Sequence, residues 1–335
     1  MRVFILISIL VISLGGCDQK KVNSNRQNHK AFSSIDSIAL ITNQIANDSS
    51  NYKLFLKRAY LNLEEGKIDP AFRDVNMALD LEPKAPETFM LLSDLYFILG
   101  NVDNAISALH KAAELDPNDE QAYIKLAETY LIIKNHSMAQ KSADIALSIN
   151  IDNDKAYFLK GIVFLELGDT AIAITNFRIA ANLDTANYEA LMQLGSLYQN
   201  AGDTIAFKYY FSALNARLDD EFVLFSIARY YQELGKYEDA LIYYEKVNED
   251  FPQNKYAFFN KAYILLVENE DFENAEITFQ QAINIDPSYV EAVYNLGRTY
   301  EAKGLYAEAA TKYRHALEIY PNYSLAIDGL NRMNQ

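Results

Sequence analysis

The sequence predicts an all-α protein in which helical hairpins stack into a solenoid. The first observation is an alanine that recurs about every 34 residues through most of the chain. The second is a glycine that falls a few positions before most of these alanines. The third is helical spacing of apolar residues, at i, i+3, i+4 and i+7, on both sides of the glycine. A hairpin with one apolar side cannot bury that side alone, so it needs neighbours of the same kind.

Residues 290–323 show the pattern most clearly. Apolar residues such as Leu296 and Tyr300 fall on one face of the first predicted helix. Gly304 follows, and glycine takes the left-handed conformation that often closes a helix. Pro321 ends the second helix, because proline cannot continue one. The segment is therefore predicted to be a helical hairpin.

Seven further copies of this unit precede it. The register marker is the alanine early in the second helix, and successive markers are separated by 34, 34, 34, 33, 34, 35 and 34 residues. The markers are Ala71, Ala105, Ala139, Ala173, Ala206, Ala240, Ala275 and Ala309. The predicted repeats are 52–85, 86–119, 120–153, 154–187, 188–220, 221–254, 255–289 and 290–323. The short fifth copy and the long seventh copy both change length near the inter-helix turn, where loops absorb such changes easily.

A small residue inside the first helix also recurs in every copy, for example Gly161 and Gly195. Such residues let two helices approach closely, and the aromatic residues Phe177 and Tyr210 of the second helices complement them.

These features closely resemble tetratricopeptide repeats, which have a period of 34, an L-G-x-x-Y run and a late proline. Residues 194–198 read LGSLY and residues 296–300 read LGRTY. The resemblance implies a right-handed superhelix whose first helices line a concave face. Residues 34–51 are predicted to form an N-terminal capping helix and residues 324–335 a C-terminal one, because a solenoid needs polar covers at its ends. The sequence departs from the pattern where Ile151, Thr185 and Leu218 replace the late proline.

The N-terminus begins with a short apolar segment. Residues 3–14 are apolar except for two serines, which is signal-peptide length and short for a membrane span. The following Leu14-Gly15-Gly16-Cys17 resembles a bacterial lipobox. That resemblance implies a cleaved lipoprotein signal peptide over residues 1–16 and acyl chains on Cys17, which together anchor a protein stably.

Residues 17–33 are polar and aperiodic, and are predicted to be a flexible tether. The expected location is therefore the bacterial cell envelope, with the protein lipid-anchored and facing the periplasm or the cell exterior. Which membrane carries it stays open. An uncleaved signal anchor and an ordinary secreted protein are the alternatives.

Charge and composition exclude several functions. The formal net charge is −15, so a domain-sized basic patch for nucleic acid is not expected. The acidic surface indicates solubility, with a basic partner as the alternative. The four histidines lack metal-ligand spacing, and neither a phosphate-binding loop nor a nucleophile motif is found. We therefore predict no enzyme activity, cofactor or metal.

Binding is expected on the first helices. In tetratricopeptide proteins, ligands contact three positions on each first helix. Here these positions are largely apolar in the first four repeats and the seventh, and mixed or polar elsewhere, for example at Arg229 and Gln232 of the sixth repeat. Such a face suits an extended or helical peptide with hydrophobic anchors, although the same residues also suit packing between repeats. The candidate contact residues are Leu56, Tyr60, Met90, Phe97, Ile124, Leu131, Phe158, Ile162, Met192, Phe259 and Tyr263.

The function predicted from these features is a membrane-tethered scaffold or adaptor that binds protein or peptide partners in the groove. The alternative is a self-associating structural lipoprotein of envelope assembly, in which a homodimer fills its own groove.

Overall fold

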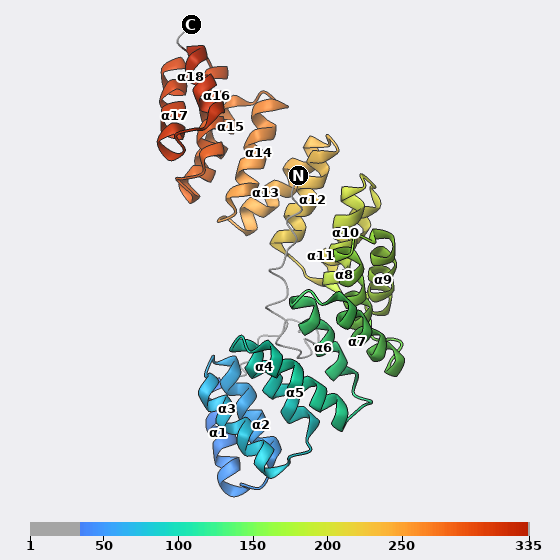
Figure 1. Ribbon diagram of the computed structural model, residues 1–335. Helices are drawn as coiled ribbons and strands as arrows, with labels where there is room; N and C mark the ends of the chain where they lie inside the picture. The colour runs from blue at the N-terminus through green and yellow to red at the C-terminus, as the bar shows by residue number, and fades with distance from the viewer. Residues whose placement is uncertain (1–33, 334–335) are drawn as a thin grey trace, which may run out of the picture. The chain divides into compact units, whose positions relative to one another are not determined.

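The computed structural model describes residues 34–333, which form 18 α-helices (Figure 1). The predicted all-α solenoid class is confirmed. The helices belong to two compact units, residues 1–83 and residues 84–335. The predicted leader, the lipid-attachment residue Cys17 and the tether lie outside the described residues.

The first unit holds one terminal helix and one hairpin. The terminal helix α1 spans Ser34–Asn47, and the hairpin consists of α2 (Tyr52–Glu64) and α3 (Ile68–Leu81). The Arg58 guanidinium of α2 binds both carboxylate oxygens of Asp74 on α3, with N–O distances of 2.8 and 2.6 Å. Arg58 also donates to Thr42 on α1 at 3.2 Å, so one side chain connects all three helices.

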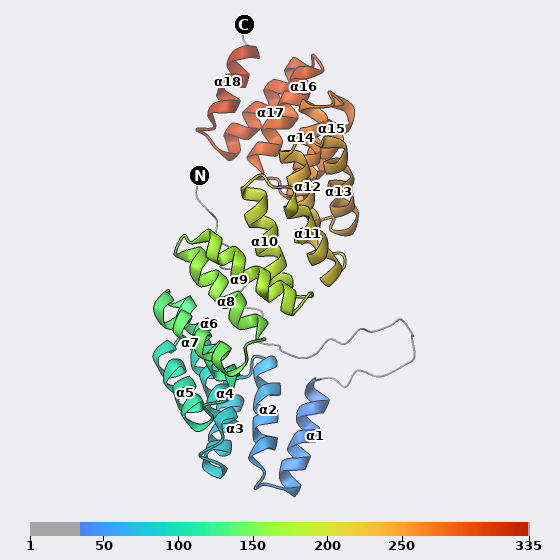
Figure 2. The ribbon, with the colours of Figure 1, turned by 90° about the vertical axis from the view of Figure 1, so that its right-hand side faces the viewer.

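The second unit holds seven hairpins and a final single helix, α18, at Ser324–Met333 (Figure 2). The first helices are α4 (Pro86–Ile98), α6 (Glu120–Ile132), α8 (Asp154–Glu166), α10 (Tyr188–Asn200), α12 (Glu221–Glu233), α14 (Lys255–Val267) and α16 (Val290–Ala302). The second helices are α5 (Val102–Leu115), α7 (His136–Ile149), α9 (Thr170–Leu183), α11 (Ile205–Ala216), α13 (Tyr237–Asp250), α15 (Phe272–Ile285) and α17 (Tyr306–Ile319).

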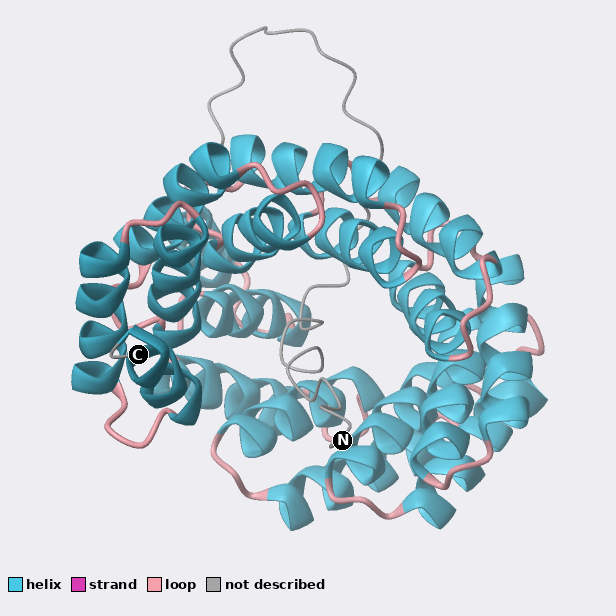
Figure 3. Cartoon of the chain, turned by 90° about the horizontal axis from the view of Figure 1, so that it is seen from above, coloured by secondary structure: helices cyan, strands magenta, loops and turns pink. Residues whose placement is uncertain are grey.

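Within this unit, consecutive helices from α4 to α18 pack against each other. Helices and their short connections account for residues 34–333, without a strand among them (Figure 3). The core of this unit therefore lies between successive helices, as expected for stacked hairpins.

Close approach within a hairpin depends on the small first-helix residue. A Cβ atom added at Gly161 would lie 2.4 Å from the Phe177 ring, and one at Gly195 would lie 2.5 Å from the Tyr210 ring. Both rings are buried. The aromatic ring thus occupies the space that the missing side chain leaves, which explains why the two residue types recur together.

The inter-helix turns use left-handed backbone. Gly304 has a φ of 76°, which confirms its predicted role. Lys134 takes the same conformation in the third repeat, with a φ of 58°, although it carries a side chain. In the seventh repeat the extra residue lengthens this turn, where Glu270 has a φ of 51°.

Asparagine N-caps join successive hairpins. Asn187 caps α10 by accepting from the Ala190 N–H at 2.9 Å, and its amide nitrogen donates to Asp154 at the start of α8 at 2.7 Å. Asn254 makes the equivalent pair of bonds, with its amide 2.8 Å from Glu221. One residue therefore ends a repeat, starts the next helix and contacts the previous first helix.

The final helix is attached through Glu301, which offers a test by pH. Glu301 accepts hydrogen bonds from Arg332 of α18, at 3.0 Å from both Nε and Nη2, and from the Tyr313 hydroxyl. These bonds, with Arg332 the largest contribution, hold the pKa of Glu301 below its ordinary value of 4.5. A pKa that is lower in the folded state adds stability above the ordinary value, and this stability is lost as the pH falls through the folded value.

We therefore expect the stability advantage of the wild-type protein over Glu301→Gln to shrink between about pH 6 and about pH 3 in denaturant titrations. Glu318→Gln, at an exposed position on α17, is the matched control for the loss of one carboxylate. A Glu301→Gln variant that loses stability with falling pH as steeply as the wild type would contradict this role.

Candidate partner-binding site

The predicted contact residues of the first unit differ in accessibility. Both lie on α2, where Leu56 is buried and Tyr60 is 45% exposed. Tyr60 is thus the member of the pair that a partner can reach.

In the second unit, the structure brings several predicted residues together on α6, α8 and α10. Ile124, Leu131, Phe158 and Ile162 belong to one apolar cluster, and the last two also pack in the next cluster with Met192. Ile124, Leu131 and Met192 are buried, so they offer a partner little surface. Phe158 and Ile162 are half-buried.

The remaining predicted residues lie on α4 and α14. Met90 and Phe97 of α4 are half-buried, and Met90 packs against the cluster between α5 and α6. Phe259 and Tyr263 of α14 are half-buried beside the C-terminal cluster. The predicted residues therefore form separate groups along the first helices.

The aromatic residues Phe158 and Phe259 each pack against a ring of their own second helix. The ring centroids of Phe158 and Phe177 are 5.7 Å apart, and those of Phe259 and Phe279 are 5.8 Å apart. These rings are primarily packing residues whose outer edges remain accessible.

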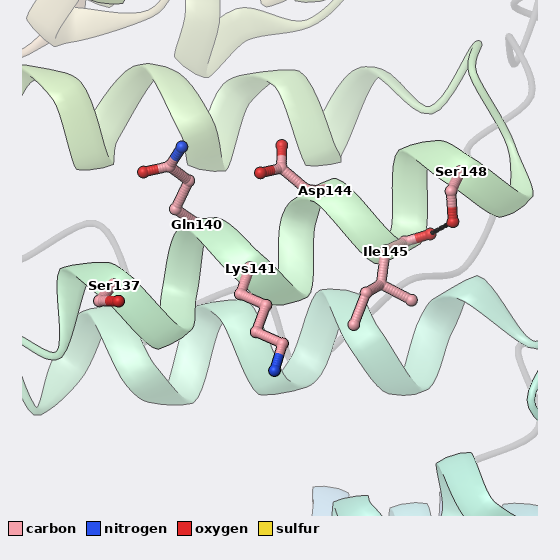
Figure 4. Close-up of a pocket in the computed structure, with 6 residues that line it drawn as sticks. All are labelled: Ser137, Gln140, Lys141, Asp144, Ile145 and Ser148. Atoms are coloured by element: carbon pink, nitrogen blue, oxygen red, sulfur yellow. Dashed lines mark hydrogen bonds between the residues drawn. The ribbon is translucent and has the colours of Figure 1, made fainter.

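One surface depression lies along α7 and has a volume of about 470 Å³ (Figure 4). All six lining residues come from this one second helix, so no other element contributes a side chain to it. Asp144, one of the six, is already paired with Lys160 at 2.7 Å. None of the predicted contact residues lies there, and we do not assign it a function.

A second cavity lies at the predicted contact positions. It has a volume of about 360 Å³ and lies between α12 and α14, next to the start of α13. We call it the α12–α14 pocket. Among its lining residues, Arg229, Gln232 and Tyr263 stand at predicted contact positions of their helices. The complete lining is Arg229, Gln232, Glu233, Tyr237, Asn260, Tyr263, Ile264 and Glu268.

Buried tyrosines of the second helices donate hydrogen bonds to polar side chains on this part of the first helices. Three second-helix tyrosines donate their hydroxyl to the polar side chain 11 or 12 positions earlier, on the first helix of the same hairpin. The pairs are Tyr210 with Gln199 at 2.6 Å, Tyr244 with Gln232 at 2.7 Å, and Tyr313 with Glu301.

Where the ring is a phenylalanine, the first-helix partner is apolar. Phe177 corresponds to Leu165, and Phe279 corresponds to Leu266. A first-helix side chain at this position is thus polar where the second helix carries a buried tyrosine hydroxyl. The hydroxyl satisfies part of the hydrogen-bonding capacity of that side chain.

The charges around the α12–α14 pocket are partly paired. Arg229 Nε lies 3.3 Å from Glu233, which also accepts from the Gln199 amide at 2.8 Å. Desolvation raises the pKa of the Tyr237 phenol, and a hydrogen bond to Glu268 adds to this effect. Within residues 34–333, no group of histidine, cysteine and acidic side chains is placed to hold a metal ion.

Sequence reasoning placed Arg229 and Gln232 at contact positions but chose contact residues by apolarity, so it missed this pocket. Asn260 was missed altogether. The available signal was a tyrosine in place of phenylalanine in the second helix of the sixth repeat, at Tyr244.

Comparison with known families covers parts of the chain. Residues 225–290 and 265–324 match a family model described as tetratricopeptide repeat, and residues 94–131 match one described as TPR repeat. These segments are tetratricopeptide repeats. The α12–α14 pocket lies inside the matched tetratricopeptide segment.

One curated protein is similar to part of the chain. The chain is 32% identical over 107 residues to Photosystem I assembly protein Ycf3 of Acaryochloris marina, which covers 32% of this chain and 57% of that protein. The matched segment thus spans little more than half the length of this curated relative.

Solved structures share the fold. The C-terminal part of a TPR repeat-containing protein from Cytophaga hutchinsonii has a TM-score of 0.62 and 21% identity, over 71% of this chain and 98% of that one. YrrB, described as a TPR protein with an unusual peptide-binding site, has a TM-score of 0.50 and 21% identity, over 58% and 100% of the two chains. PilF of Pseudomonas aeruginosa has a TM-score of 0.53 and 15% identity, over 62% and 94%. These similarities support the tetratricopeptide fold.

Proposed function

We propose that this protein is a membrane-tethered scaffold or adaptor of the bacterial envelope, whose tetratricopeptide repeats bind a protein or peptide partner. The observation that carries the proposal is the α12–α14 pocket, because three of its lining residues occupy predicted contact positions. Half-buried apolar residues at Met90, Phe97 and Ile162 supply further contact surface on the first helices. Polar groups in a pocket give specificity, and apolar surface gives affinity.

The comparisons support the general role. Tetratricopeptide proteins are generally protein-binding scaffolds or adaptors. YrrB is described as having a peptide-binding site, and Ycf3 is described as an assembly protein. By analogy, we propose a peptide segment or a folded protein as the partner of this chain.

The tether is proposed from the N-terminal sequence. Leu14-Gly15-Gly16-Cys17 provides the lipobox, and the polar residues after it provide a spacer. Among residues 34–333, we find no helix of the length and apolarity that a bilayer span requires. Acyl chains on Cys17 would attach the repeats to the membrane.

Capture from membranes tests the binding role. The double variant Gln232→Ala/Tyr263→Ala should reduce recovery of the partner by at least about tenfold, because it removes a polar and an aromatic group from one pocket. Lys141→Ala/Ser148→Ala on α7 is the matched control, because it alters the other surface depression. Identical protein profiles for the wild type and the pocket variant would rule out this binding site.

Self-association is the competing outcome of this experiment. Light scattering of the detergent-solubilised chain would then show a stable dimer, and the pocket variant would convert it to a monomer.

A further inference from the structure

Gln232 differs from Gln199 and Glu301, the two other polar residues that accept a hydrogen bond from a buried tyrosine, in its remaining partners. The Gln199 amide nitrogen donates to Glu233 at 2.8 Å, and Glu301 is bound by Arg332 at 3.0 Å. The Gln232 amide nitrogen donates to none of residues 34–333, and Gln232 lines the α12–α14 pocket. The pocket therefore contains a hydrogen-bond donor, Gln232 Nε2, whose side chain is fixed by Tyr244 and which has no acceptor among residues 34–333.

The orientation of this amide follows from the Tyr244 hydroxyl. Tyr244 is fully buried, and its O–H donates to Gln232 Oε1 at 2.7 Å. Burial raises the pKa of the Tyr244 phenol above its ordinary value, so the group keeps its proton at neutral pH. Because the Gln232 oxygen accepts this bond, its NH₂ group is the part left to face the pocket.

A second amide, from Asn260 of the next hairpin, interacts with this phenol. The Asn260 amide lowers the pKa of the Tyr244 phenol, as a donor near that oxygen does. None of residues 34–333 donates a hydrogen bond to the Asn260 oxygen, so this oxygen can serve as an acceptor. Asn260 also lines the pocket. A donor on α12 and an acceptor on α14 therefore border one cavity.

Charge and shape restrict what this cavity accepts. The pocket lining contains two carboxylates, Glu233 and Glu268, and one guanidinium, Arg229, so its formal charge is negative. A carboxylate ligand would meet net negative charge, which disfavours it. Tyr263 and Ile264 provide apolar wall. A volume of about 360 Å³ lies near the lower end of the range for ligand pockets, roughly 300–1,000 Å³.

We infer that the α12–α14 pocket receives the side-chain amide of a glutamine or asparagine in the partner. Its carbonyl oxygen would accept from Gln232 Nε2, and its NH₂ group would donate to Asn260 Oδ1. A side chain fits a cavity between two helices, whereas an extended main chain would pass across the first helices. This inference rests on the proposed partner-binding function and specifies the chemistry of its pocket.

Amino-acid amides test this specificity with the full chain in detergent. The probes are the N-acetyl N′-methylamides of glutamine, glutamate and leucine, and the readout is the NMR shift of the Gln232 and Asn260 side-chain amides. We expect the glutamine probe to bind at about millimolar Kd, and the other two probes to bind at least about tenfold more weakly. The Tyr244→Phe variant should weaken binding of the glutamine probe by about three- to tenfold, because the Gln232 amide loses the hydroxyl that orients it.

Tyr210→Phe is the matched control, because it removes the same hydroxyl from the fifth repeat, where Gln199 is already engaged by Glu233. It should leave probe affinity unchanged. Each variant removes the donor to one glutamine oxygen, so both should melt at a somewhat lower temperature than the wild type while remaining folded, and probe affinity is compared below that temperature.

Three results would overturn the inference. Equal binding of all three probes would indicate recognition of the main chain, and tighter binding of the glutamate probe would indicate a carboxylate site. Absence of any Tyr244→Phe effect would remove the role of the hydroxyl. None of these results depends on partner capture, so a failure here is distinct from a failure of the proposed function.

Discussion

The Gly161→Leu variant should be destabilised by about 3 kcal/mol, the upper part of the range for overpacking a core. Even a single Cβ atom at this position would lie 2.4 Å from Phe177 Cε1 and 2.5 Å from Cδ1. The Phe177 ring is fully buried and packs against Phe158 at 5.7 Å, so it cannot move aside without displacing a second ring. Leucine would therefore force α8 and α9 apart.

Hydrogen exchange shows where this loss occurs. Because contacts in a stack of hairpins join nearest neighbours, protection should fall first in α8 and α9 and less in distant hairpins. Lys155→Leu adds a leucine at an exposed position of the same helix and is the matched control. A Gly161→Leu protein as stable as this control would show that the ring and the glycine are not tightly packed.

In the Cys17→Ala variant, incorporation of a fatty-acid analogue should fall to background, whereas the wild type should be labelled and should partition into the detergent phase. Each buried CH₂ group of an acyl chain contributes about 0.8 kcal/mol to membrane binding, and anchoring by several chains is stable. Without the thiol, neither the first acylation nor the cleavage that depends on it is expected. Labelling with a fatty-acid analogue measures the modification directly.

Ser24→Ala is the matched control, because it lies in the predicted tether and leaves the lipobox intact. Its partitioning should match that of the wild type. Fatty-acid label on the Cys17→Ala protein would exclude Cys17 as the attachment site.

The repeat architecture could be predicted because the same small residues recur at tightly packed positions. The register markers Ala105 and Ala240 are buried, as are their counterparts in the other hairpins. A position that tolerates only a small side chain leaves a strong periodic signal, and left-handed glycines such as Gly304 mark the turns. Lys134 shows the limit, because its left-handed turn carries no glycine signal.

The candidate binding site could be predicted only in part from the sequence. The face of a helix on which a residue lies can be predicted from the sequence, but the extent to which a neighbouring helix covers that residue cannot. Ile124 and Met192, for example, stand at contact positions but are buried. The polar α12–α14 pocket depends on Tyr244, a core residue that a search of the surface pattern does not consider. The partner contacts of the half-buried residues stay predictions.

The asparagine caps also suggest how such an array can grow. The segment 154–187 begins with the acceptor Asp154 and ends with the donor Asn187, and these two groups bond across one full unit at 2.7 Å. A tandem copy of this segment would carry a matching donor and acceptor at its new junction from the moment of duplication. Gene duplication within this part of the chain would therefore add a hairpin whose connection needs no further substitution.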